Sequence, residues 1–266
     1  MTVSAHPAPD ALPRRKRRVW PWVLGGFLVL VVVALVAVDA LARGFAEGLI
    51  ADQAADVLDV PAGTPVDVSI GGGPVLIQLV SGSLEHVDVQ VEGYAVGPLA
   101  GDLTLTAEGI PFDLTAPTRS LTVRYDVAGE ALGAISGSLS GVPIDSVTLE
   151  EPEVVANGSV SLLGLTLPLG LGLTPAAVDG ALAFTPTSAR IGDATIEASA
   201  LASDPIWGGL AGTVLQQQTV CIADQLPAAL TMTTVEVVGD VLRIEFDGSG
   251  QALDGGGFTT RGSCPA

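Results

Sequence analysis

The chain has 266 residues, of which 48% are hydrophobic, 4% aromatic and 15% charged. This apolar content excludes a disordered or coiled-coil chain, and the length is enough for one large domain or two small ones. From Leu41 to Ala266 there are six arginines, no lysine and 27 acidic residues, a formal charge of −21 that repels nucleic acid and excludes it as a partner.

The N-terminal part of the chain predicts a membrane anchor. A basic run at residues 14–18 precedes about 20 nearly uninterrupted apolar residues from Val19 to Val38, the length that crosses a bilayer. Because basic flanks stay cytoplasmic, the chain after Asp39 should lie outside the cytoplasmic membrane, or be secreted if Val38-Asp39-Ala40 is a cleavage site. The expected parts are a basic cytoplasmic tail at 1–18, a single-pass transmembrane anchor or signal segment at 19–40, and an extracytoplasmic domain at 41–266.

An amphipathic helix is predicted directly after the membrane segment, ending at Pro61 and Gly63. The positions of its apolar face recur every three or four residues and are uncharged, with Gln53 the one polar member: Ala42, Phe45, Ala46, Leu49, Ile50, Gln53, Ala54, Val57 and Leu58. The period then changes to alternation, which predicts a strand over Val66–Ile70. The sequence Gly71-Gly72-Gly73-Pro74 breaks this strand, and a second strand is predicted over Val75–Val80.

Alternating apolar and polar residues predict half-buried antiparallel strands through the rest of the first half. They lie around Val87–Val91, Leu103–Ala107 and Leu121–Tyr125. A second short helix is predicted to carry Ala131, Leu132, Ile135 and Leu139.

In the second half, a strand over Ile144–Leu149 leads to a hairpin turn expected at Asn157-Gly158. Between Ser159 and Thr174, leucines occupy one face of a strand, and a bulge near Leu163-Gly164 would keep Val160 and Leu162 on that face. Further strands are expected at Leu182–Phe184 and Ile191–Ile196, a helix from Pro205 toward Cys221, and a final hairpin of Met232–Val238 and Val241–Phe246. Short links between strands predict an α+β fold with a mainly antiparallel sheet.

Cys221 and Cys264, the only cysteines, are expected on the oxidising side of the membrane, which favours a disulfide over two free thiols. The known enzyme signatures are absent, so we expect no catalytic residue, metal or cofactor. His86 lies on the polar face of a strand, where a surface role is more common than catalysis. Glu150, Glu151 and Glu153 could bind a cation, but a solvated loop is the more common meaning of such a cluster.

Strands lined by leucine and valine, with few aromatic residues and many glycines, suit a bent sheet around an elongated cavity for acyl chains. The alternative is an ordinary close-packed core. The residues expected to line the cavity are Leu76, Leu79, Leu165, Leu167, Leu169 and Leu171. Arginines pair with phosphates, so the candidates for headgroup contacts are Arg119, Arg124, Arg190 and Arg243, unless they balance neighbouring carboxylates.

Three stretches of the chain resemble a known family. They are the helix from Arg43 to Leu58, the segment Gly73–Leu79 followed by Gly82, Leu84, Val87 and Val89, and Cys221 with Leu226-Pro227, Leu230, Val235, Phe246 and Cys264. Together they resemble the actinobacterial LmeA-like proteins, a family described as phospholipid-binding. The resemblance implies a tubular lipid-binding fold, with a long helix against a strongly curved antiparallel sheet. It also implies an envelope protein that supports lipomannan or mannan elongation, and it names no catalytic residue.

The leading hypothesis is a membrane-tethered phospholipid-binding protein that holds or passes lipid on the periplasmic side of the membrane, with envelope glycosyltransferases as further partners. The second hypothesis is an acidic, β-rich ectodomain that docks envelope enzymes and binds no lipid. The third is a hydrolase that uses scattered carboxylates, which would require two acids to converge in a cleft near His86 or the Glu150 cluster.

Overall fold

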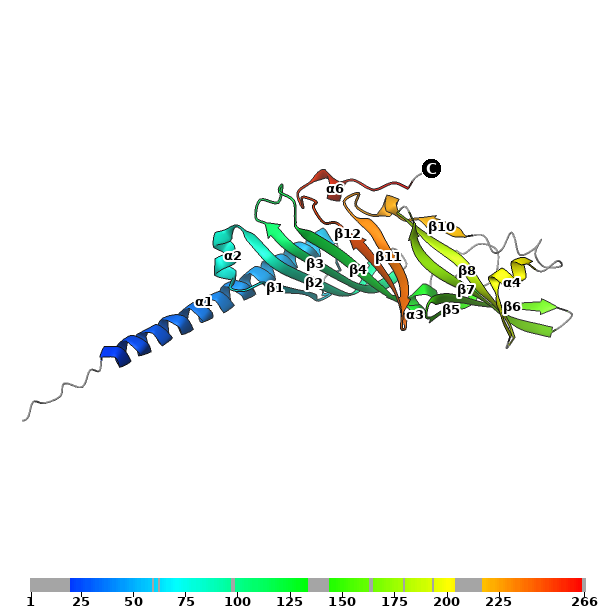
Figure 1. Cartoon of the computed structure of the whole chain (residues 1–266), viewed down its shortest axis with the longest axis horizontal. Coiled ribbons are helices and arrows are strands. Elements are labelled where there is room, and N and C mark those ends of the chain that lie inside the picture. The colour runs from blue at the N-terminus through cyan, green and yellow to red at the C-terminus, as the bar shows by residue number, and fades with distance from the viewer. Residues whose placement is uncertain are drawn as a thin grey trace, which may run out of the picture.

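A computed structural model describes residues 20–58, 60–61, 63–96, 99–133, 144–162, 165–178, 180–192, 194–203 and 217–264. Its most prominent feature is a continuous helix, α1 (Trp20–Val57), which projects from a body made of two sheets (Figure 1). The predicted membrane segment and the predicted amphipathic helix are therefore one element. The helix is long and apolar enough to cross a membrane, and it lies near the N-terminus, where a signal sequence has the same properties.

The first sheet is antiparallel, with the strand order β1-β2-β3-β4-β12-β11. Its strands are β1 (Val66–Gly71), β2 (Ser83–Val96), β3 (Leu99–Pro111), β4 (Ser120–Ala128), β11 (Thr231–Val238) and β12 (Val241–Asp247). The predicted alternation is confirmed in β4, where Leu121, Val123 and Tyr125 are buried. The final hairpin is also confirmed, with Leu242, Ile244 and Phe246 facing inward.

The second sheet is also antiparallel, with the order β10-β8-β7-β6-β5 and with β9 paired to β8. Its strands are β5 (Ile144–Glu150), β6 (Glu153–Leu162), β7 (Leu165–Val178), β8 (Ala181–Ile191), β9 (Ala194–Glu197) and β10 (Gln218–Cys221). Short helices complete the fold: α2 (Val75–Ser81), α3 (Gly129–Leu132), α4 (Ala198–Ser203), the 3-10 helix η2 (Ala223–Gln225) and α6 (Gly256–Thr259). The predicted α+β class with mostly antiparallel sheets is confirmed.

The hydrophobic core lies on the inner face of the first sheet. Buried residues from β1, β2, β3, β4, β11 and β12 form most of it, and the second sheet contributes buried Val154. Ala46 and Ile50 of α1 pack against it from one side, while Leu182 and Phe184 of β8 pack against it as well. β7 contacts β11, so the two sheets share one core.

The strand predicted over Val75–Val80 is wrong, because this segment is the helix α2. Val75 and Gln78 are both buried, and their three-residue spacing fits one face of a helix. Pro74 fixes the N-cap with φ −63°, and Gly82 ends the helix in the left-handed region at φ +82°. A continuous apolar run has no period of two, so the sequence pattern alone did not separate strand from helix.

Three further expectations need correction. Asn157-Gly158 lies inside β6, and the turn between β5 and β6 is at Glu151-Pro152, which has a cis peptide bond. The expected bulged strand is two strands, β6 and β7, with Leu162 paired with Leu165, and the positions of the expected bulge, 163–164, lie outside the described residues.

The helix predicted from Pro205 toward Cys221 lies largely outside the described residues, and its end is β10 instead. Ile135 and Leu139 of the second predicted helix also lie outside them, and the described part of that helix is α3. The disulfide between Cys221 and Cys264 is present, which confirms the predicted pairing and ties the C-terminal segment to β10.

Candidate functional site

The part of α1 beyond the membrane segment carries two parallel rows of apolar side chains at four-residue spacing. The first row packs against the core and consists of Ala46, Ile50, Ala54 and Leu58. This row attaches α1 to the first sheet beside β1. Side chains four apart lie on one face of a helix, so the packing of this row fixes which side of α1 faces the sheet.

The second row, which we call the exposed row, is Leu41, Phe45, Leu49 and Val57. Their exposed fractions are 75%, 77%, 62% and 73%, respectively. Such exposure is unusual for large apolar side chains that follow one another along a helix, and contiguous apolar surface of this kind marks a binding site or a membrane contact. The exposed row continues the apolar surface of the membrane segment, where Val33 and Val36 are also exposed.

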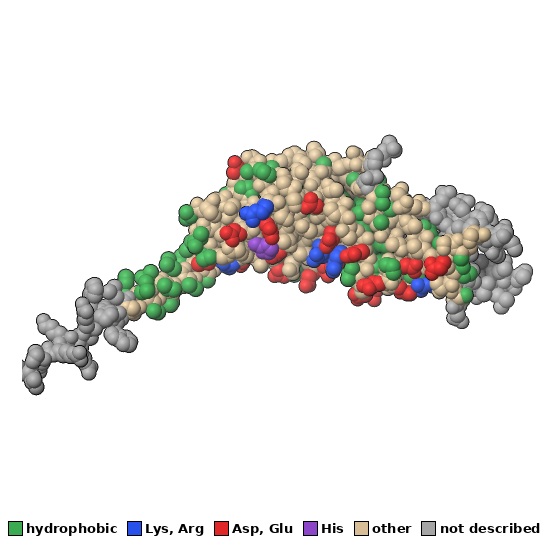
Figure 2. Space-filling model, viewed as in Figure 1, with side chains coloured by type: hydrophobic (Ala, Val, Ile, Leu, Met, Phe, Trp, Pro, Cys, Tyr) green, Lys and Arg blue, Asp and Glu red, His purple; other side chains and the backbone are tan. Residues whose placement is uncertain are grey.

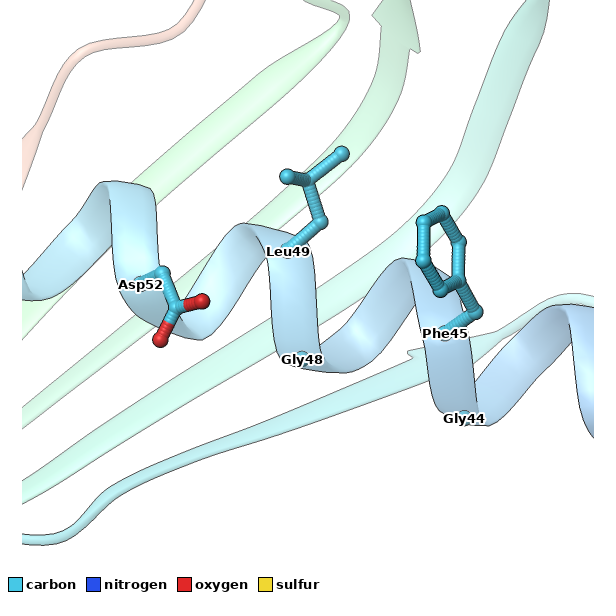
Figure 3. A pocket seen from close by; sticks show the side chains of 5 residues that line it. All are labelled: Gly44, Phe45, Gly48, Leu49 and Asp52. Carbon is cyan, nitrogen blue, oxygen red and sulfur yellow. The ribbon is translucent and has the colours of Figure 1, made fainter.

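A shallow hollow of about 280 Å³ lies on α1 along the exposed row. Gly44, Phe45, Gly48, Leu49 and Asp52 line it. In Figure 3, Phe45 and Leu49 project from the same side of the helix, and Asp52 points elsewhere. A Cβ atom built on Gly44 or Gly48 meets no atom within 4 Å, so the two glycines leave open space. The hollow therefore offers a mainly apolar surface with one carboxylate at its end.

Polar side chains of α1 fix the helix to the body just after the membrane segment. Asp39 Oδ1 accepts a hydrogen bond of 3.0 Å from the Leu76 N–H of α2. Arg43 donates to the carbonyl oxygens of Ile70 and Gly73, and Glu47 Oε1 accepts from the Ile70 N–H at 3.0 Å. These bonds join α1, β1 and α2, so the direction in which α1 leaves the body is set by the fold.

The leucines predicted to line a cavity lie in two parts of the fold. Leu76 is half-buried and Leu79 is 51% exposed, both on α2. Leu169 and Leu171 are half-buried in β7. Leu165 and Leu167 belong to β7 too, but their side chains lie outside the described residues.

The two faces of the second sheet differ in chemistry. A Cβ built on Gly172 would touch Glu153 and Ser188, and one on Gly170 would touch Arg190 and Asn157, so this face is polar. Glu153 accepts hydrogen bonds from Thr187 at 2.6 Å and from Ser188 at 2.9 Å. Because neighbouring residues of a strand point to opposite faces, Leu169 and Leu171 lie on the other, apolar face. We call it the leucine face; it meets the core at Val154, which pairs with Leu173.

Three of the four candidate headgroup arginines are paired with carboxylates. Arg124 bonds Glu245 at 2.9–3.0 Å, Arg243 makes two bonds of 2.9 Å to Asp126, and Arg190 contacts Glu150 at 2.8 Å. The hydrogen bonds that Arg243 donates to the Asp126 carboxylate raise the pKa of Arg243. Arg119 is exposed, and within the described part of the chain its guanidinium forms no ion pair.

The acidic residues do not form a metal centre within the described ranges, where no group of three His, Cys, Asp or Glu side chains could hold an ion. His86 Nε2 lies 2.7 Å from Asp88 Oδ2, and His86 Nδ1 lies 3.9 Å from Glu108 Oε1. Glu151 accepts a hydrogen bond from the Gly239 N–H. Figure 2 shows acidic side chains along the lower side of the body and hydrophobic ones on the protruding helix.

Sequence reasoning did not single out the hollow on α1. The sequence nevertheless contains a pattern that indicates it. Gly44 and Gly48 are four residues apart and so lie on one side of the helix, and the helix has more apolar residues than a single row can hold. A helix that buries one face needs an apolar stripe of about 100°. The two adjacent rows of α1 exceed that width, which indicates a second apolar contact.

The model of a protein family described as LmeA-like phospholipid-binding matches residues 37–247 of the chain. This range begins at the end of the membrane segment and ends at the last residue of β12. It therefore contains the exposed row, the hollow and both sheets. No curated protein and no solved structure matches the chain.

Proposed function

Because the chain belongs to the LmeA-like phospholipid-binding family, we propose that it binds phospholipid in a domain held on the outer side of the cytoplasmic membrane by α1. The basic run at residues 14–18 supports this orientation, since basic flanks remain in the cytoplasm. In this proposal the protein is a binding protein and not an enzyme, as its family is a binding family. It holds or passes lipid and requires no cofactor.

The observation that carries the proposal is the exposed row of α1. Phe45 and Leu49 are exposed along a helix that leads directly out of the membrane segment. An acyl chain lying in the hollow would cover these side chains and would gain the free energy of removing apolar surface from water. The path from bilayer to hollow then follows one continuous helix, and a chain could move along it without crossing a polar surface.

We propose the leucine face of the second sheet as a second acyl-chain surface, with Leu165, Leu167, Leu169 and Leu171 as its wall, while Leu76 and Leu79 lie apart from it on α2, beside α1. The half-buried state of Leu169 and Leu171 supports this, because such side chains can still be covered by a ligand. A strongly curved, tubular arrangement of the sheets would join the two surfaces. Leu169→Glu should then remove lipid binding at this face while the fold survives, whereas the same charge in a close-packed core would unfold the protein.

Among the candidate arginines, Arg119 is the one that could bind the lipid phosphate without first breaking an ion pair to a carboxylate within the described residues. A phosphate at Arg124, Arg190 or Arg243 would first have to displace a carboxylate at about 2.8–3.0 Å. Arg119 immediately precedes β4, its N–H donates to the Glu108 carbonyl, and its side chain is open to solvent. Exposed guanidinium groups bind phosphate through paired hydrogen bonds.

We place this binding in envelope lipid or lipoglycan biogenesis, including mannan elongation, with glycosyltransferases as the proteins that receive or sense the lipid. A purely protein-docking ectodomain is the alternative. It is less favoured because a docking surface built on the acidic body leaves the exposed row of α1 without an occupant.

The experiment that tests the proposal is the identification of lipid bound to the purified full-length chain by native and denaturing mass spectrometry. Gly48→Leu fills the hollow without a clash, since no atom lies within 4 Å of the added Cβ. It also replaces a helix-interior glycine, which should raise helix stability by up to about 1 kcal/mol. Loss of bound phospholipid in a protein of equal or higher stability therefore cannot be attributed to unfolding.

The matched control is Gln53→Leu, which adds an apolar side chain on the same helix outside the residues that line the hollow. Because position 53 lies in the exposed row between Leu49 and Val57, the added leucine extends the apolar surface and leaves the hollow open, so this variant should retain lipid at or above the wild-type level. A wild-type protein that folds but neither retains phospholipid nor takes it up from liposomes would refute the proposed function and favour the docking alternative.

A further inference from the structure

Helix α2 carries an exposed apolar surface of its own, away from the hollow and from the leucine face. Ile77 is 66% exposed, Leu79 51% and Val80 90%, and α2 contains no charged residue. The other side of the helix is fully buried, with Val75 at 0% and Gln78 at 2% exposure. The apolar side chains are thus presented to the outside by a helix whose opposite face is locked into the body.

The attachment of α2 is rigid and polar. The Gln78 side-chain amide donates to the carbonyls of Gly71 at 2.8 Å and Gly73 at 3.2 Å, and its Oε1 accepts from the Glu85 N–H at 2.8 Å. The nitrogen and the oxygen of this buried amide together make three hydrogen bonds that hold α2 against β1 and β2. Such an arrangement fixes the direction in which Ile77 and Val80 point.

The position of α2 beside the end of the apolar run of α1 indicates what covers the exposed side chains of α2. The apolar run from Trp20 to Val38 rises about 28 Å at about 1.5 Å per residue, close to the hydrocarbon thickness of about 30 Å. Asp39 is the first charged residue after that run, and its carboxylate binds the Leu76 N–H in the first turn of α2. Figure 1 shows α2 beside α1 at the point where the helix enters the body. If α1 spans the bilayer, α2 lies at the boundary between hydrocarbon and headgroups.

We propose that α2 is an interfacial anchor that inserts Ile77, Leu79 and Val80 into the outer leaflet of the bilayer. This inference rests on the proposed membrane anchoring by α1, and its occupant is the lipid surface. A helix that lies in the plane of the interface buries its apolar face about 5–10 Å into the headgroup and acyl boundary. Two contacts, α1 and α2, fix the tilt of the body, whereas one helix alone would leave it free to rotate.

The fixed tilt has a consequence for the hollow on α1. Phe45 lies six residues after Asp39, about 9 Å farther along the helix axis. With α2 seated in the leaflet, the hollow starts within about two helical turns of the bilayer surface. A lipid can then enter it from the outer leaflet with only a short displacement of its acyl chain.

The test uses the full-length chain reconstituted in phosphatidylcholine vesicles that contain a doxyl-labelled phospholipid as quencher. Single cysteines for an environment-sensitive fluorophore are introduced by Val80→Cys in α2, Val33→Cys in the membrane segment and Thr185→Cys on an exposed position of β8. The native cysteines are joined in a disulfide and do not react with the label. We expect a blue-shifted emission and lipid quenching at positions 33 and 80, and quenching at least several-fold weaker at position 185.

Each outcome decides between the inference and its premise. Quenching at position 33 but not at 80 overturns the anchor role of α2 and leaves the membrane anchoring by α1 intact. Blue-shifted emission at position 80 without lipid quenching means that a second copy of the chain covers α2, which also overturns the inference. Absence of quenching at position 33 refutes the proposed anchoring itself.

A second variant tests the role of the apolar surface. Ile77→Asp introduces a charge at an exposed position, so folding should be unaffected. With the fluorophore at position 80, this change should reduce lipid quenching several-fold while quenching at position 33 is unchanged. Equal quenching at position 80 with and without the charge would show that α2 lies near the membrane without inserting.

Discussion

Replacing two residues of the exposed row should weaken phospholipid binding by a calculable amount. Full burial of a large apolar side chain is worth about 1.5–3 kcal/mol. Since 77% of Phe45 and 62% of Leu49 are exposed, an acyl chain that covers both gains about 2–4 kcal/mol at that rate. The double variant Phe45→Gln with Leu49→Gln removes this gain, so we expect affinity to fall about 30-fold to several hundred-fold, at about 1.4 kcal/mol per tenfold.

The assay is a titration of phospholipid into the delipidated, detergent-solubilised full-length chain, with the bound fraction read by native mass spectrometry. Glutamine keeps a high helix propensity, and both positions face solvent, so the free energy of unfolding should change by less than about 1 kcal/mol. Val57→Gln is the matched control, because Val57 is 73% exposed on the same helix but does not line the hollow. Wild-type affinity in the double variant, or an equal loss on changing Val57 at the far end of the exposed row, would refute the assignment of the hollow beside Phe45 and Leu49 as the lipid site.

Three further predictions concern the fold that supports these surfaces. Gln78→Leu removes three hydrogen bonds of a buried amide. At about 1 kcal/mol per bond, the free energy of unfolding measured in urea should fall by about 3 kcal/mol. The control Gln90→Leu, at an exposed position, should lower it by less than about 0.5 kcal/mol. Cys221→Ser with Cys264→Ser opens a loop with a sequence separation of 43 and should cost about 4 kcal/mol, and identical unfolding midpoints under oxidising conditions would contradict this. Burial raises the pKa of Tyr125 above its ordinary value of 10.0, so its contribution to stability should be complete below pH 10 and be lost as the pH rises through the folded-state pKa. Tyr125→Phe should flatten the alkaline fall of the unfolding midpoint, and an unchanged slope would show that another group titrates.

The strands of the first sheet were predictable because one of their faces is buried and the other is exposed to solvent. Val87, Val89 and Val91 alternate with polar residues, and all three are buried in β2. A pattern with a period of two leaves only one register in which every apolar side chain faces the core. The terminal hairpin follows the same logic, with Gly239 supplying the positive φ that its turn requires.

Where no polar residue marks the outer face, the sequence was ambiguous. The run from Val75 to Val80 is apolar except for the buried Gln78, and α2 exposes half of it, so no alternation could distinguish helix from strand. The turn expected at Asn157-Gly158 failed for a related reason, because the pairing of β6 with both β5 and β7 outweighs the local turn preference of two residues. The predicted amphipathic helix did not separate the exposed row from the residues that pack on the core, because periodicity reports that a side chain is apolar and not what covers it.

The exposed row and the surface of α2 share a physical problem that argues for lipid as their occupant. Exposed leucine and phenylalanine side chains next to a membrane segment would aggregate in water if nothing covered them. A protein partner with a basic surface would be attracted by the acidic body, yet the exposed row itself contains no charge and α2 contains none. In the proposed anchoring, phospholipid would cover both regions at once, since its acyl chains cover apolar side chains and the bilayer surface would lie at the level of Asp39. Under that proposal, the surfaces that are unfavourable in water make the stability of the domain depend on the membrane.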